Sequence, residues 1–256
     1  MKIIGHRGAR GEAPENTLGG FRHIVDLGLK AVEFDVRLLR DGKLAVLHDA
    51  TLQRTAGQSD LLADLNTNNL SHFDNRQGWT DWTQPEPIPT LQQVLDILTS
   101  FDHIEVEVKA VESEDDVLKI TEQLMIELNT WSNQHAITVT SFDVRILAAL
   151  QHSRIAQKHQ LKTGLLLEPS LSSNDNDSSE SQTYVQQALE LGCSRIGLSD
   201  KLATEPRVSA IKDAGLLISI WTVNSTERAK TLQNWQIDGL ITDHPSLMLA
   251  NLIGNI

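Results

Sequence analysis

Histidine and arginine side chains stand where short apolar segments of this sequence end. His6 and Arg7 follow the pair Ile3-Ile4 and open a glycine-rich stretch, and His48 closes a second apolar run. An imidazole exchanges protons near neutral pH, and a guanidinium is a permanent planar cation, so the pair His6-Arg7 suits phosphate ester chemistry. His6 and His48 together could serve as a general acid and a general base. In a simpler interpretation, each is a structural or solvent-facing residue at a strand end.

Two carboxylates alternate with apolar residues in segment 31–36. Side chains two residues apart point to the same face of a strand, so Glu33 and Asp35 should point one way and their apolar neighbours the other. Two carboxylates inside a barrel repel each other and lose hydration unless a cation lies between them. Oxygen ligands suit a hard divalent cation, Mg²⁺ or Ca²⁺. The alternative is a surface strand with two solvated acids.

Segment 103–109 repeats this alternation and places Glu105, Glu107 and Lys109 on one face. Glu107 is the acid nearer to the C-terminal end of the segment and could complete a site of three carboxylates. Lys109 could then lie beside Glu107 and reach an oxyanion of a substrate. A salt-bridged edge strand would show the same alternation, so this segment alone is only moderately specific.

Polar and aromatic residues also end the later predicted strands. Trp221 and Asp243 are examples, and catalytic residues of α/β barrels come from the C-terminal ends of several strands. Trp221 could form an apolar wall for an alcohol group, or it could cap the barrel core. The sequence favours neither role over the other.

Short apolar segments alternate with helical patterns along the whole chain. The predicted strands are 2–6, 31–36, 103–109, 136–141, 161–167, 194–198, 216–221 and 238–242. The predicted helices are 18–27, 91–98, 114–131, 144–151, 183–191, 204–214, 226–233 and 245–252. Eight such alternations in 256 residues predict a (β/α)8 TIM barrel, with a doubly wound open sheet as the alternative.

Two segments interrupt this alternation. Residues from about 49 to 89 are polar and aromatic, with Phe73, Trp79 and Trp82, and they are too long for a bare loop. We expect a small inserted subdomain after the second strand region, within a single domain spanning residues 1–256. Residues 170–181 are rich in Ser, Asn and Asp and are expected to form an exposed loop.

Composition indicates which classes of partner and which cell compartment suit the protein. A net charge of −12 argues against nucleic acid and anionic membrane surfaces, although a bound metal would admit an anionic substrate. The sequence lacks a stretch of about 20 apolar residues, so we expect no membrane span. Cys193 is the single cysteine, which excludes an intrachain disulfide and fits a cytoplasmic location. The sequence does not decide between a monomer and a homo-oligomer.

Taken together, these residues resemble the glycerophosphodiester phosphodiesterase family of the bacterial cytosolic type. The resemblance spans nearly the whole chain in the order of the family's motifs. It is carried by His6-Arg7-Gly8, Glu15-Asn16-Thr17, Glu33-Phe34-Asp35-Val36, Asp41-Gly42, His48-Asp49, Arg54-Thr55, Ile88-Pro89-Thr90-Leu91, Glu107-Val108-Lys109, Trp221-Thr222-Val223-Asn224 and Asp238-Gly239-Leu240-Ile241-Thr242-Asp243.

The resemblance implies hydrolysis of glycerophosphodiesters to sn-glycerol 3-phosphate and an alcohol, with one divalent cation, Mg²⁺ or Ca²⁺. It also implies a role for each matching residue. The metal ligands would be Glu33, Asp35 and Glu107, the general acid and base His6 and His48, and the phosphate-binding residues Arg7 and Lys109. We expect His6 to be the acid and His48 the base.

The chain departs from the family's pattern at two positions. Glu105 stands where the family often has an asparagine, and it could add a charge or a ligand. Arg54-Thr55-Ala56 replaces the usual Arg-Thr-Thr run. Two alternatives remain: a lysophospholipase D-type phosphodiesterase, with Phe73, Trp79 and Trp82 as an apolar lip, and an inactive barrel that acts as a binding module.

Overall fold

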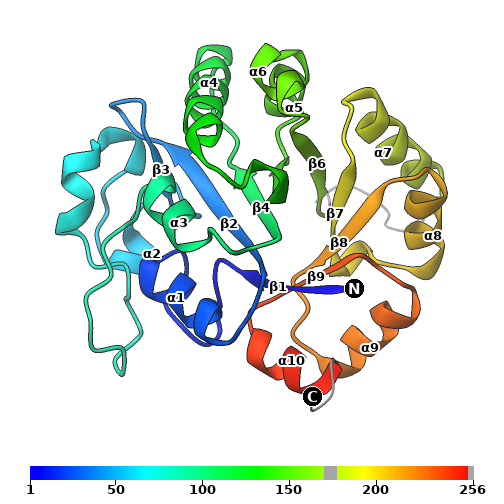
Figure 1. The fold of residues 1–256 in the computed structure, drawn as a ribbon, viewed down its shortest axis with the longest axis horizontal. Coiled ribbons are helices and arrows are strands. Elements are labelled where there is room, and N and C mark those ends of the chain that lie inside the picture. The colour runs from blue at the N-terminus through cyan, green and yellow to red at the C-terminus, as the bar shows by residue number, and fades with distance from the viewer. Residues whose placement is uncertain (170–177, 253–256) are drawn as a thin grey trace.

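Eight parallel strands close into a barrel in the computed structural model of the chain, which describes residues 1–169 and 178–252 (Figure 1). Barrel strands that follow one another in the sequence pair side by side, and β1 closes the ring by pairing with both β2 and β9. The predicted TIM barrel is therefore confirmed, and an open sheet is excluded. The barrel strands are β1 (Lys2–His6), β2 (Ala31–Leu38), β4 (His103–Val108), β5 (Ile137–Ser141), β6 (Lys162–Leu167), β7 (Arg195–Ser199), β8 (Leu217–Trp221) and β9 (Gly239–Thr242).

Helices surround the barrel and follow the strands as the sequence predicts (Figure 1). Thr90 and Ser225 cap helix N-termini with their side chains, and Gly28, Gly192 and Gly215 lie just beyond helix ends with positive φ. No helix among those described has the length and apolar character needed to cross a bilayer. The principal helices are α1 (Leu18–Asp26), α3 (Leu91–Ile97), α4 (Glu114–Thr130), α5 (Val144–His152), α7 (Ser178–Glu190), α8 (Glu205–Asp213), α9 (Thr226–Asn234) and α10 (Pro245–Leu252).

Alternation along the strands separates an apolar layer from a polar interior. Val32, Phe34 and Val36 belong to the main apolar core beneath the helices, where Phe34 contacts Phe21 of α1 edge-on with ring centroids 5.5 Å apart. The residues between them point into the barrel. This division confirms the two-residue period predicted for segment 31–36 and brings its acids to the inside.

Three local features differ from the predicted elements. The run before His48 forms a short strand, β3 (Leu44–Val46), which pairs antiparallel with β2 outside the barrel ring. A short helix, α6 (Arg154–Lys158), follows α5. Helix α7 begins at Ser178, so the last residues of the predicted loop 170–181 are helical, while residues 170–177 lie outside the described part. Polar composition alone does not fix where a helix starts.

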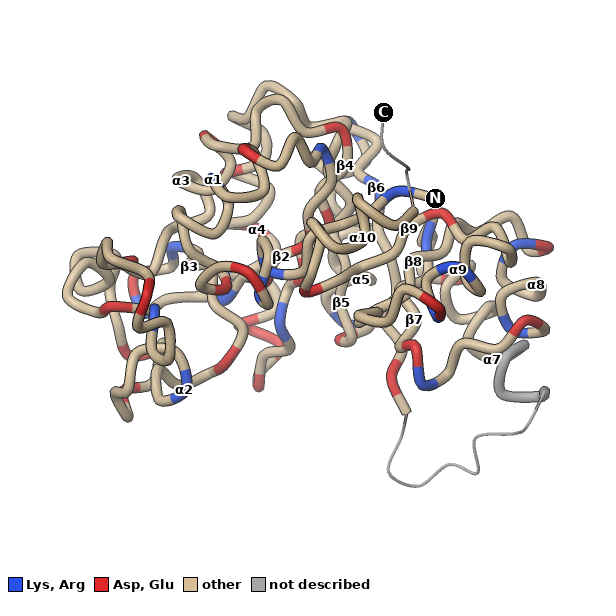
Figure 2. Tube along the Cα trace, turned by 90° about the horizontal axis from the view of Figure 1, so that it is seen from below, with Lys and Arg blue, Asp and Glu red and all other residues tan. Residues whose placement is uncertain are grey.

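The segment from 49 to 89 contains only short helices, namely α2 (Gln53–Ala56), η1 (Leu62–Asp64) and η2 (Thr67–His72). Its apolar side chains form a cluster separate from the main core, including Leu52, Leu62 and Leu70, together with Leu47. Figure 1 and Figure 2 both place α2 far across the barrel from α8, and Figure 2 shows acidic and basic residues spread along the whole trace. The insertion therefore lies to one side of the barrel.

Candidate active site

Three carboxylates meet inside the barrel toward the C-terminal ends of β2 and β4. Glu33 and Asp35 point inward from β2, and the strand register sets Asp35 beside Glu107 of β4. One carboxylate oxygen of each residue lies within 4.8 Å of the others. All three residues are buried, with relative exposures of 6%, 0% and 8%. The structure thus brings together the three residues expected to bind a metal.

Burial and mutual repulsion oppose full ionisation of this cluster. Burial raises the pKa of Glu33 well above its usual range, and the charge of Asp35 raises it further. The same two causes raise the pKa of Glu107 to about 7. Burial also opposes ionisation of Asp35, but Lys109 and Arg7 outweigh it and hold the pKa of Asp35 well below its usual range. Asp35 is therefore firmly ionised, whereas the ionised forms of Glu33 and Glu107 would be stabilised by additional positive charge.

The two cations expected to bind phosphate lie beside the cluster and pair with its carboxylates. Arg7 contacts Asp35 Oδ2 through Nε at 3.2 Å and donates to Glu15 Oε1 through Nη1 at 2.9 Å. Lys109 Nζ lies 2.9 Å from Asp35 Oδ1 and 2.5 Å from Glu107 Oε1. Arg7 has a φ of 50° and precedes Gly8, whose φ of 88° suits a residue without Cβ. This tight turn directs the Arg7 side chain back over the barrel mouth.

Both histidines carry a carboxylate at the same ring nitrogen. His6 Nδ1 lies 2.6 Å from Asp243 Oδ1, and His48 Nδ1 lies 2.6 Å from Asp49 Oδ1. Such a contact keeps a proton on Nδ1 and leaves Nε2 for proton transfer. Burial lowers the pKa of each histidine, and the bonded carboxylate opposes that change. His6 Nε2 lies 3.9 Å from Glu33 Oε2, so this nitrogen faces the carboxylate cluster.

A cavity of about 530 Å³ opens over the carboxylate cluster. Trp221 lines the cavity, is half-buried and meets Phe142 edge-on with ring centroids 5.7 Å apart. Its indole therefore faces the space above the cluster, as a wall for a substrate would. The other predicted site residues that line the cavity are His6, Arg7, Glu33, His48, Glu107 and Lys109, while Asp35 lies beneath them.

The residues of the cluster fit a divalent cation. Glu33, Asp35 and Glu107 supply three carboxylates against the two positive charges of Arg7 and Lys109, and Arg7 also shares its charge with Glu15. When all three carboxylates are ionised, the excess charge is negative and buried, and it lies on oxygen ligands, which suit Mg²⁺ or Ca²⁺ better than softer metals. No other group of three or more His, Cys, Asp or Glu side chains in the described ranges offers such a set.

Several residues of the site were not assigned a role from the sequence. Asp49 and Asp243 stood in the quoted motifs, but their partnership with the histidines was not predicted. Arg54 binds Glu15 with both terminal nitrogens, at 2.6 and 2.7 Å, and Asp49 through Nε at 2.7 Å, so it ties the insertion to the barrel. Arg37 also lines the cavity, and its position two residues after Asp35 on the same strand face could have revealed it.

Glu105 is fully buried beside Glu33 in the strand register and lines the cavity, but it does not belong to the group of three carboxylates. Its Oε1 accepts hydrogen bonds from His103 Nε2 at 2.8 Å and Ser219 Oγ at 2.7 Å, and Arg195 Nη1 lies 3.6 Å away. Burial raises the pKa of Glu105, but the bond from His103 and the charge of Arg195 outweigh it and lower the pKa overall. Glu105 thus pairs with Arg195 and His103 and is not one of the clustered carboxylates.

The aromatic residues of the insertion do not form a lip on the cavity. Phe73 packs against the apolar cluster of the insertion, and Trp82 Nε1 donates to Glu86 Oε1 at 2.9 Å. Among the described residues that line the cavity, the aromatic ones are Phe142 and Trp221. The apolar lip expected at Phe73, Trp79 and Trp82 is therefore wrong, because these side chains pack within the insertion or lie away from the cavity.

Comparisons with known proteins agree with this fold and identify the family. A sequence model of the glycerophosphoryl diester phosphodiesterase family matches residues 6–247. A glycerophosphodiester phosphodiesterase of Bacillus altitudinis is 27% identical over 244 residues, which cover 95% of each chain. A lysophospholipase D of Rattus norvegicus is 40% identical over 62 residues, 24% of this chain and 20% of that protein.

A solved structure supports the fold independently of the sequence matches. The Oleispira antarctica phosphodiesterase, determined in complex with the product sn-glycerol-3-phosphate, superposes with a TM-score of 0.85 at 23% identity. The superposition covers 99% of this chain and 97% of that chain. At this identity the likeness supports the barrel fold alone.

Proposed function

Because the chain belongs to the glycerophosphoryl diester phosphodiesterase family, we propose that it hydrolyses glycerophosphodiesters to sn-glycerol 3-phosphate and an alcohol. The family resemblance and the enzyme class expected from the sequence are confirmed by the match over residues 6–247 and by the full-length relatives. One observation carries the proposed mechanism: a buried cluster of three carboxylates shares a cavity with two histidines, each oriented by an aspartate.

Glu33, Asp35 and Glu107 would hold one divalent cation, Mg²⁺ or Ca²⁺, and the bound ion would polarise a phosphoryl oxygen and stabilise the charge that develops on it. Arg7 and Lys109 would bind the non-bridging oxygens of the diester. Both already lie at the cluster, so binding requires only that they exchange part of their carboxylate contacts for phosphate. Two fixed cations near the phosphate also favour the more negative transition state.

The two histidines would move the protons of the reaction. His48 Nε2 would take a proton from the attacking oxygen, and His6 Nε2 would give a proton to the departing alkoxide. Asp49 and Asp243 hold each ring by Nδ1 and stabilise its imidazolium form. Trp221 would provide the apolar wall against which the alcohol lies. The proton lost by the attacking group is thus balanced by the proton delivered to the leaving group.

We also propose that residues 1–256 form one domain with a small inserted subdomain at about 49–89. Two features support this division. Strands from β1 to β9 join one sheet, and Arg54 of the insertion is bound to Glu15 of the barrel. The apolar cluster of the insertion lies beside the main core and includes Leu39 and Leu47, which flank the edge strand β3.

Hydrolysis of lysophospholipids is the second candidate function, favoured by the segment similar to the rat lysophospholipase D. The position of Phe73, Trp79 and Trp82 outside the cavity lining counts against this function. Release of sn-glycerol 3-phosphate from glycerophosphocholine, glycerophosphoethanolamine and glycerophosphoglycerol, compared with choline release from lysophosphatidylcholine, decides between the two. We expect turnover of the soluble diesters with Mg²⁺ or Ca²⁺. Turnover of lysophosphatidylcholine alone would support the second candidate, and substrate binding without turnover would indicate an inactive binding module.

A further inference from the structure

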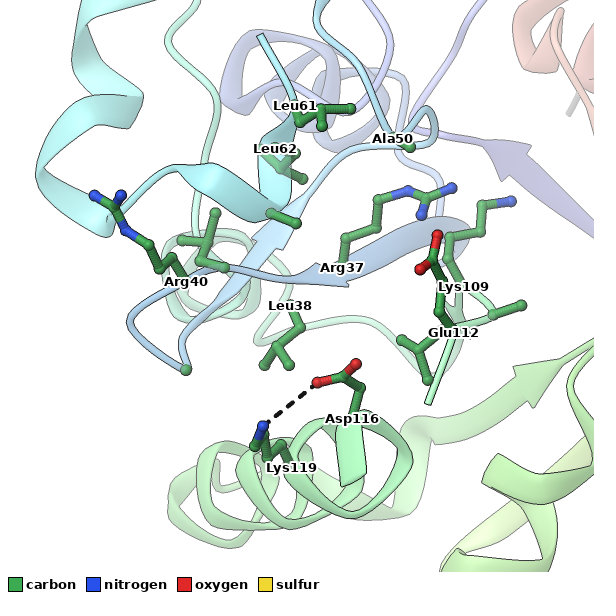
Figure 3. A pocket seen from close by; sticks show the side chains of 15 residues that line it. Arg37, Leu38, Arg40, Ala50, Leu61, Leu62, Lys109, Glu112, Asp116 and Lys119 are labelled. Atoms are coloured by element: carbon green, nitrogen blue, oxygen red, sulfur yellow. Dashed lines mark ion pairs between the residues drawn. The ribbon is translucent and has the colours of Figure 1, made fainter. Parts of the chain in front are cut away.

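A second cavity, of about 620 Å³, adjoins the catalytic one at the end of β2 (Figure 3). We call it the side cavity; it lies between the end of β2, η1 of the insertion and the start of α4. The two cavities share Arg37, Lys109 and Ala110 as lining residues. Pockets that bury most of a small ligand measure about 300–1,000 Å³, so the side cavity has room for one substituent of a diester.

The walls of the side cavity combine aliphatic and charged side chains. Leu38, Leu61, Leu62 and Val111 supply apolar surface, and Leu61 is 49% exposed. A wall of this kind can enclose the carbon skeleton of an alcohol, and of the two cavities only the catalytic one is lined by Glu33, Glu107 and both histidines. A diester bound at the cluster could therefore extend one substituent past the shared residues into the side cavity.

Arg37 and Arg40 line the side cavity without an ion pair to a carboxylate of the described residues, and of the two only Arg37 is half-buried and also lines the catalytic cavity. Lys119 pairs with Asp115 at 3.2 Å and Asp116 at 3.5 Å, whereas no carboxylate of the described chain lies within 4.0 Å of the Arg37 guanidinium. Arg37 Nε donates to the carbonyl oxygen of His48 at 2.8 Å. Figure 3 shows the guanidinium directed toward Lys109, and both residues line the two cavities. A half-buried guanidinium without a counter-ion is stabilised by an anionic ligand.

The position of Arg37 along β2 separates it from the reacting phosphate. Arg37 lies two residues beyond Asp35, an advance of roughly 7 Å along an extended strand. Asp35 belongs to the cluster that would hold the metal, and Arg7 and Lys109 already supply cations there. An anionic group bound by Arg37 would therefore belong to the substituent that extends from the cluster into the side cavity, and not to the reacting phosphate.

We propose that the side cavity binds the alcohol half of the diester and that Arg37 binds an anionic group, a carboxylate or a phosphate, on that half. The proposal rests on the proposed function, and it names the preferred substrates as glycerophosphodiesters of acidic alcohols. Arg37 then determines specificity by forming an ion pair with the anionic group of the alcohol half, while Arg7 and Lys109 bind the reacting phosphate.

Two substrates that differ by one carboxylate test this proposal. Glycerophosphoserine carries a carboxylate on its alcohol half, and glycerophosphoethanolamine has the same skeleton without it. We expect the wild type to have the higher kcat/KM for glycerophosphoserine. Arg37→Gln should lower this kcat/KM by roughly 10- to 100-fold, the worth of a charge-assisted hydrogen bond, and lower that for glycerophosphoethanolamine by less than about threefold. Arg22→Gln, an exposed change on the outer helix α1, is the matched control and should change neither.

The ratio of the two kcat/KM values separates specificity from a structural effect. Because Arg37 also holds the carbonyl of His48, a displaced histidine would lower both values equally, and an equal loss overturns the proposal. An equal loss would also result if Arg37 bound the reacting phosphate. Should Arg37→Gln unfold, Arg37→Lys keeps the charge without the planar fork and should still reduce the ratio. If the wild type is active but does not distinguish the substrates, the inference fails; if it hydrolyses neither, the proposed function fails.

Discussion

Replacing Asp243 by asparagine removes a charge from His6 while keeping the shape of the side chain. Asp243 follows β9, its Oδ1 lies 2.6 Å from His6 Nδ1, and its Oδ2 accepts from Asn224 Nδ2 at 2.8 Å. The asparagine can occupy the same space, but it cannot stabilise an imidazolium as a carboxylate does. We therefore expect a folded enzyme whose His6 is harder to protonate.

The pKa of Asp243 gives the magnitude of this effect. Burial opposes its ionisation, but the hydrogen bond and charge of His6, with Asn224 and Arg10, together outweigh burial and lower the pKa from 3.8 to about 2. At about 1.4 kcal/mol for each pKa unit, the ionised form gains roughly 2.5 kcal/mol, part of it from Asn224 and Arg10. A loss of 1–2 kcal/mol from the protonated His6 corresponds to a decrease of kcat by roughly 5- to 30-fold. Folding stability should fall too, because a lowered carboxyl pKa stabilises the fold above about pH 4.

The pH dependence of kcat shows which proton His6 transfers. A general acid must be protonated, so activity falls as the pH rises through its pKa, and a lower His6 pKa should move the alkaline limb of Asp243→Asn to lower pH. Asp49→Asn is the matched change at His48, and it should move the acidic limb to lower pH. The assay measures kcat between about pH 5 and 9 at saturating metal. If Asp243→Asn shifts the acidic limb, His6 is the base; if it shifts neither limb, Asp243 does not tune His6.

Three further changes test other parts of the site. Alanine at His6 or His48 should lower kcat by roughly 10²- to 10⁴-fold with little change in Tm, and near-normal kcat would contradict its role. Glu107→Gln should raise the metal concentration for half-maximal activity by roughly tenfold or more in titrations of metal-free enzyme; an unchanged titration would exclude Glu107 as a ligand. Glu105→Ala should cost about 3–5 kcal/mol in urea unfolding, because Arg195 loses its buried counter-ion; an unchanged midpoint would contradict the pairing.

The fold was predictable because its signals are local. Apolar runs that end in polar residues, helix caps and helix-ending glycines are patterns of about ten residues or fewer. Together they predict the eight strands and the helices between them. β3 and α6 were not predicted because both are very short, and a run of three residues such as Leu44–Val46 has little periodicity of its own. Its pairing with β2 depends on a turn and on tertiary contacts.

The active site was predictable in part for a similar reason. Glu33 and Asp35 share a strand face, so their proximity follows from the two-residue period. The bond between His6 and Asp243 joins residues 237 positions apart, and it exists because β1 pairs with β9 when the barrel closes. The pairing of Glu105 with Arg195 likewise requires two strands on different sides of the barrel. Only the closed structure shows such contacts.

Release of sn-glycerol 3-phosphate from glycerophosphoethanolamine, measured before and after removal of metal, decides whether the carboxylate cluster works as proposed. EDTA should abolish the release, and adding Mg²⁺ or Ca²⁺ back should restore it in the wild type. In Glu107→Gln, restoration should require more metal than in the wild type. Turnover that is unaffected by the chelator would contradict a metal-dependent reaction at Glu33, Asp35 and Glu107.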